Sequence, residues 1–225
     1  MRTHLAILLL ALGWGPASAQ TAPTSAEIAN YTGLHRAAYD GRADDIRQLA
    51  AAGENLEARD RHGRTAVHVA AFAAQAEALS ALAAAGANMN ARESSAYDAV
   101  TIAAVANDPV LMSLAISLGN DPGLVTSPYD GTALIAAAHL GHAEVVERLV
   151  RAGAPLDHVN NLGWTALLEA VILGDGGPNH QAVVRTLVEA GADREIGDRN
   201  GMTPLDHARA RGYAAIVRTL ESPGR

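Results

Sequence analysis

Apolar and polar positions along the chain follow one pattern that repeats about every 33 residues, a period typical of stacked repeats. A large aliphatic residue marks the same place in each copy, namely Leu34, Val67, Val100, Leu134, Leu167 and Leu205. A second series of landmarks runs beside the first, namely Gly53, Gly86, Gly119, Gly153 and Gly191. Both series are almost evenly spaced, and in both the last interval is the longest. Two independent series with the same period and the same late lengthening predict a stack of repeated units, or solenoid.

The copy over residues 60–92 shows what each unit predicts. A polar turn that contains Gly63 precedes Thr65, whose hydroxyl can cap a short helix rich in small and β-branched residues. A second apolar helix follows and ends before Gly86. Neither helix is long enough to be stable alone, so each unit must bury its apolar face against its neighbours.

This order of turn, helix, helix and glycine resembles the ankyrin repeat. The matching segments are Thr65-Ala66-Val67-His68, Thr132-Ala133-Leu134, Thr165-Ala166-Leu167, Thr203-Pro204-Leu205, Gly141-His142, Gly86-Ala87-Asn88, Gly153-Ala154 and Gly191-Ala192-Asp193. The resemblance implies an all-α ankyrin-repeat solenoid of about six helix-turn-helix units joined by β-hairpin-like turns. We place the units at residues 31–59, 60–92, 93–126, 127–159, 160–197 and 198–221.

Several parts of the chain depart from the repeat. The third unit has Asp98-Ala99-Val100-Thr101 in place of the usual tetrad, and the fifth has five extra residues in the stretch 174–179. That glycine-rich stretch lacks the lysine of a phosphate-binding loop, and we interpret it as a flexible insertion. The first and last units are atypical, as capping units are. Residues 20–30 form a lead segment and residues 222–225 a tail.

The segment 1–19 has the features of a secretory signal peptide. A polar start precedes an apolar run from Leu5 to Leu12, and Ala17-Ser18-Ala19 matches the small-residue cleavage pattern. The run is too short to span a bilayer, which takes about 20 residues. We therefore expect cleavage after Ala19, no membrane insertion of the mature chain, and a location in the periplasm or outside the cell.

Composition narrows the classes of function further. The chain has no cysteine, which excludes disulfides, thiolate nucleophiles and Cys-ligated metals. Its net charge of −7, without a long basic run, makes it a poor binder of nucleic acid. All 17 basic residues are arginine, and this bias together with the many alanines suggests a GC-rich bacterial genome.

The nine histidines raise the question of an enzyme or a metal site. His35, His68 and His142 occupy positions where the ankyrin family uses histidine for hydrogen bonds within the scaffold. No His-Glu-x-x-His spacing and no Gly-x-Ser-x-Gly segment is present. We expect no catalytic residue, metal or cofactor, with a metal-dependent or other hydrolase as the alternative.

The resemblance also points to a binding surface, because the turn tips and the exposed side of the first helix line the concave face of ankyrin stacks. The positions carried over to this face include Arg61, His62, Arg64, Phe72, Tyr97, Tyr129, Leu162, Trp164 and Met202, together with His139, Ile172 and Leu173 on the first helices of the fourth and fifth units. Aromatic residues and arginine dominate binding hot spots. The face is expected to be basic near Arg61 and Arg64 and apolar near Trp164. We therefore expect a monomeric scaffold that binds another protein, with a secreted effector or immunity protein as a further alternative.

Overall fold

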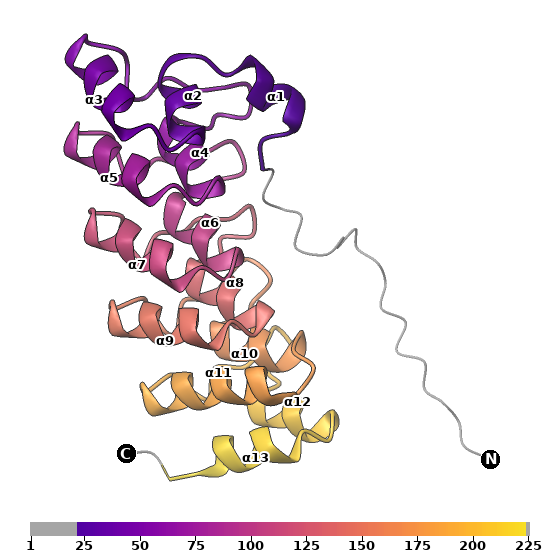
Figure 1. The fold of residues 1–225 in the computed structure, drawn as a ribbon. Coiled ribbons are helices and arrows are strands. Elements are labelled where there is room, and N and C mark those ends of the chain that lie inside the picture. Colours follow the sequence, from indigo (N-terminus) through magenta and orange to yellow (C-terminus); the bar gives the residue numbers. More distant parts are fainter. Residues whose placement is uncertain (1–21, 224–225) are drawn as a thin grey trace.

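The computed structural model describes residues 22–223, where the chain forms helices and no strand beyond an isolated antiparallel pairing of Val125 with Thr132. The inner layer consists of α2 (Gly33–Tyr39), α4 (Ala66–Phe72), α6 (Ala99–Val105), α8 (Ala133–Leu140), α10 (Ala166–Ile172) and α12 (Pro204–Ala210). The outer layer consists of α3 (Ala43–Ala51), α5 (Ala76–Ala84), α7 (Pro109–Ser117), α9 (Ala143–Arg151), α11 (Pro178–Glu189) and α13 (Ala214–Glu221). Each helix packs on the next member of its own layer, which gives the elongated two-layer stack in Figure 1.

A hydrogen-bonding residue fixes where most inner helices begin. Thr132 and Thr165 accept a bond from the backbone N–H three residues later, as a helix N-cap does. In the irregular third unit Asp98 plays the same part, accepting from the Thr101 N–H at 2.8 Å. Asp98 is buried, and burial raises the pKa of its carboxyl group. The third unit therefore keeps the helix start with a different chemical group.

Alanine pairs allow the inner helices to approach closely. The fifth and sixth residues after the capping residue are fully or almost fully buried in four successive units, namely Ala37 and Ala38, Ala70 and Ala71, Ala103 and Ala104, and Ala137 and Ala138. Larger aliphatic side chains, such as Leu134 and Leu167, fill the space between the two layers. One continuous core therefore runs the length of the stack, and the first five units contribute the same positions to it.

The turns between units are closed in a similar way each time. A backbone bond joins the first and last residues of the turn, as in Asp60 N–H to Arg64 O and Asn160 N–H to Trp164 O, both at 3.0 Å. In most turns the side chain of the first residue also accepts bonds from the third and fifth N–H groups, and Asn160 Oδ1 does so at 3.0 Å for Leu162 and Trp164. These bonds account for the expected hairpin-like turns without a continuous sheet.

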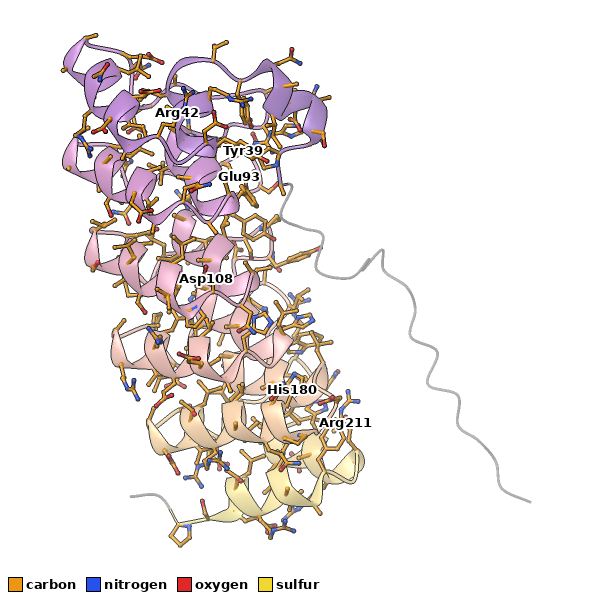
Figure 2. All side chains as sticks on the ribbon, in the orientation of Figure 1. Tyr39, Arg42, Glu93, Asp108, His180 and Arg211 are labelled. Atoms are coloured by element: carbon orange, nitrogen blue, oxygen red, sulfur yellow. The ribbon has the colours of Figure 1, made fainter. Side chains whose placement is uncertain are left out.

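The insertion in the fifth unit, interpreted from the sequence as a flexible loop, makes several hydrogen bonds to its surroundings. Part of the extra length extends α11 to 12 residues, whereas α9 has nine. Tyr213 Oη donates to the Gly174 carbonyl at 2.9 Å, and Gln181 Nε2 donates to Gly176 O at 2.7 Å. His180 Nδ1 lies 2.8 Å from Asp175 Oδ1, and His180 Nε2 lies 3.0 Å from the backbone oxygen of His139. Figure 2 shows His180 among the side chains in the lower half of the stack.

The expected all-α stack of paired helices is confirmed. Within the lead segment expected over residues 20–30, residues 25–30 form the short helix α1 (Ser25–Asn30). A capping box between Thr24 and Glu27 fixes its start. The predicted signal peptide of residues 1–19 lies outside the described residues.

The continuous core predicts that two valines of the outer layer, one buried and one exposed, contribute differently to the free energy of unfolding. Val146 in α9 is fully buried, whereas Val110 in α7 is 68% exposed. We expect Val146→Ala to lower the free energy of unfolding by about 2 kcal/mol, since it loses transfer free energy and leaves a cavity. Val110→Ala should change it by less than about 0.5 kcal/mol. Urea titrations followed by circular dichroism measure both, and equal losses would contradict the assignment of the core.

Candidate partner-binding face

The concave face is defined here as the exposed side of the inner helices together with the adjoining turns. In the first five units a row of half-buried side chains follows it at the seventh residue after the capping position, namely Tyr39, Phe72, Val105, His139 and Ile172. Leu140 and Leu173 lie next to this row and are also half-buried. Of these, Phe72, His139, Ile172 and Leu173 were expected on this face from the sequence. The constant offset from the cap is the sequence signal that also identifies Tyr39 and Val105.

Six of the expected residues occupy turns and remain at least partly accessible. Tyr129 is 42% exposed at the tip of its turn, and Arg61 is exposed as well. His62, Leu162, Trp164 and Met202 are half-buried. The backbone N–H of Asn161 bonds to Tyr129 O at 2.9 Å, so the turns of the fourth and fifth units support each other. The turns therefore form a continuous edge beside the row of inner-helix side chains.

Arg64 was expected to line this face, but the structure buries it completely. Its guanidinium donates to Glu27 Oε1 at 2.6 Å and to Asp60 Oδ2 at 2.7 Å. Arg61 and His62 also lie within 3.1 Å of that Glu27 oxygen. The expected basic end of the face is therefore wrong, because two carboxylates neutralise these side chains. Arg64 instead joins α1 to the second unit.

Tyr97 was also expected at the surface, and it is 5% exposed. It packs in the core of the third unit, where its backbone carbonyl lies 3.1 Å from His68 Nε2. Burial, reinforced by the nearby Glu93 carboxylate, raises the pKa of Tyr97 to about 12. Tyr97 occupies the same turn position as Arg64. Both were expected to be exposed because this turn position was assumed to be accessible to solvent.

A buried carboxylate lies beneath the concave face in the fifth unit. Glu169 in α10 accepts from Asn160 Nδ2 at 2.9 Å, and its other oxygen lies 3.1 Å from His139 Nδ1. The side chain of Glu169 is 5% exposed, whereas that of His139 is 35% exposed. Asn160 also closes the turn that carries Trp164. One hydrogen-bonded network therefore connects the turn, the inner helix and the neighbouring unit.

The remaining histidines considered as candidates take part in the scaffold. His68 Nδ1 lies 2.9 Å from Thr65 Oγ1, and His35 Nε2 lies 2.9 Å from Arg64 O. His142 Nδ1 lies 2.9 Å from Ala104 O in the preceding unit. Burial lowers the pKa of His68 to about 4, so this imidazole is neutral at pH 7. These contacts match the structural roles inferred from the sequence.

Within residues 22–223, no group of three or more metal-ligating side chains comes together. Among the same residues, no helix has the length and apolar character needed to cross a membrane.

The comparisons with known proteins agree on one family. The family profile described as "Ankyrin repeats (3 copies)" matches residues 4–93 and 100–198. The putative ankyrin repeat protein YahD of Escherichia coli is 34% identical over 189 residues, which cover 84% of this chain and 94% of YahD. This chain therefore belongs to the ankyrin-repeat family.

Solved structures support the same assignment. An ankyrin repeat domain from Acinetobacter baumannii is 42% identical, has a TM-score of 0.75, and is matched over 83% of this chain and 95% of that domain. The ankyrin repeat protein EF0377 is 30% identical with a TM-score of 0.76, over 85% and 98% of the two chains. Ankyrin repeats generally mediate binding between proteins and are typically not enzymes.

The contact between Glu27 and Arg64 predicts how stability depends on pH. Burial alone would raise the pKa of Glu27, but hydrogen bonds from Thr24 and the charge of Arg64 outweigh it and lower the pKa to about 2 from 4.5. The stabilisation is thus fully present above pH 4.5 and is lost as the pH falls toward 2. We expect Glu27→Gln to lower the free energy of unfolding by about 2 kcal/mol at pH 7.

Urea titrations at pH 7 and at pH 3 measure this effect, with Glu189→Gln in α11 as an exposed control. The difference between wild type and Glu27→Gln should shrink at the lower pH, while the control should match wild type at pH 7 within about 0.5 kcal/mol. A difference for Glu27→Gln that stays constant over this range would contradict the ion pair.

Proposed function

We propose that this protein is a non-catalytic scaffold that binds another protein through its concave face. The observation that carries the proposal is the row of half-buried, mostly apolar side chains along the inner helices, beside turns that present Tyr129 and Trp164. Partly exposed aromatic and aliphatic side chains supply binding free energy when a partner covers them. The regular bonds within and between turns hold this surface in place, so little ordering entropy is lost on binding.

Incorporation of a benzophenone amino acid tests which face is bound. We expect photo-crosslinking in the native host to give adducts of higher mass from Phe72 and Leu173, and none from the exposed Val110 in the outer layer. Leu173→Asp should abolish the adduct formed at Phe72, because a charge in the row opposes burial by a partner. Denaturing gels with immunodetection measure the adducts. Adducts from Val110 alone would refute concave-face binding.

We further propose that the protein is exported and acts in the periplasm. The support is the apolar run from Leu5 to Leu12 and the Ala17-Ser18-Ala19 segment that follows it. Export would place the partner in the same compartment. The absence of cysteine suits an oxidising environment, since no thiol is available for unwanted disulfides.

Mass spectrometry of the protein purified from its host tests the export proposal. We expect a mature N-terminus at Gln20 and recovery in the periplasmic fraction. Ala17→Glu with Ala19→Glu should leave an uncleaved chain in the membrane fraction, because small residues are needed at the cleavage site. Full-length wild type in the cytoplasm would contradict export, and mature protein in the medium would instead support a secreted role.

A further inference from the structure

The scaffold itself does not require a carboxylate at the position of Glu169. The same position, four residues after the capping residue, carries Val69 in the second unit and Ile102 in the third, both fully buried. Ala136 fills it in the fourth unit. Burying a charge is unfavourable unless it is paired, so a glutamate there adds a cost that the aliphatic residues avoid.

No arginine or lysine of the described residues pairs with Glu169. Its hydrogen bonds come from the neutral amide of Asn160 and from the imidazole of His139, which carries a charge only when protonated, and the chain contains no lysine. Glu27 is also buried, but the guanidinium of Arg64 lies 2.6 Å from its carboxylate. Among residues 22–223 no such arginine contact is found for Glu169. A cation from outside the chain would complete this pairing.

The fifth and sixth units carry the carboxylate on different elements. It lies on the turn in the sixth unit and on the inner helix in the fifth. In the sixth unit the turn carries Asp198 and the inner helix carries His207, 3.0 Å apart. In the fifth unit the turn carries Asn160 and the inner helix carries Glu169, at the corresponding positions. The exchange moves the negative charge from the turn to the helix that forms the floor of the concave face.

The surroundings of Glu169 favour a cation that also has apolar contacts. Half-buried Trp164, Ile172 and Leu173 belong to the same unit, and His139 of the preceding unit lies beside the carboxylate. The guanidinium of Arg199, from the following turn, is held by the Asn161 carbonyl. A carboxylate in apolar surroundings attracts a cation more strongly than one in water.

We propose that Glu169 is a specificity-determining residue and selects a partner segment with an arginine or lysine flanked by apolar side chains. This proposal rests on concave-face binding. The partner's cation takes the place of His139 beside the Glu169 carboxylate, and the flanking residues cover Ile172 and Leu173. Arginine is the better fit, since its planar guanidinium can bond the carboxylate and stack on Trp164.

Selection of random peptides displayed on phage, against the immobilised full chain, tests the proposal. We expect wild type and the control Glu189→Gln to enrich peptides with a basic residue beside apolar ones. Glu169→Gln should bind the same synthetic peptides about tenfold or more weakly, as expected for loss of a charged hydrogen bond. Replacing the peptide's basic residue with glutamine should weaken binding to wild type and leave binding to Glu169→Gln unchanged.

The remaining outcomes of the peptide selection distinguish failure of the role of Glu169 from failure of concave-face binding. Peptides that are lost with Leu173→Asp but show no basic preference, or that bind Glu169→Gln as well as wild type, overturn the role of Glu169 and leave concave-face binding intact. Failure to select any Leu173-dependent peptide overturns both. Should Glu169→Gln fail to fold by circular dichroism, Glu169→Val replaces it, because the second unit carries valine at this position.

Discussion

The structure depends on one constraint, which is that no unit can bury its own apolar surface. Helices as short as seven to nine residues, which make up all of the stack but α11, leave most of their side chains open until a neighbour covers them. The paired alanines of the inner layer allow that neighbour to come close. The regular turns follow from this requirement, because each must return the chain to the same distance and direction. Stability is therefore shared between adjacent units and belongs to no single one.

The sequence predicts the fold well because the constraint acts at every repeat. The period, the capping threonines and the glycines all point to the same two-layer stack, and the structure has helices at those places. Even the irregular third unit fits, since Asp98 accepts the same backbone bond as a threonine. Repetition supplies several independent observations of each feature, so one exception does not obscure the pattern.

The candidate face is predicted less well, because exposure at a given repeat position depends on the neighbour. Arg64 and Trp164 occupy the same turn position, yet one is buried and the other half-buried. The difference arises from Glu27, which lies before the first recognisable repeat and so has no signal in the period. Glu169 was missed for the opposite reason, since apolar residues occupy its position in three other units. Position within a repeat therefore predicts location better than accessibility.

The helix α1 has a consequence for how the stack opens at its N-terminal end. In a linear array the terminal unit has a single neighbour and ordinarily frays first. Here Glu27 bonds to Arg64 and Tyr31 bonds to Asp60, so both α1 and the start of the first unit are tied to the second unit. The first unit cannot separate without breaking these buried bonds as well. The first two units consequently open as one cooperative block, with a shared rate of amide hydrogen exchange.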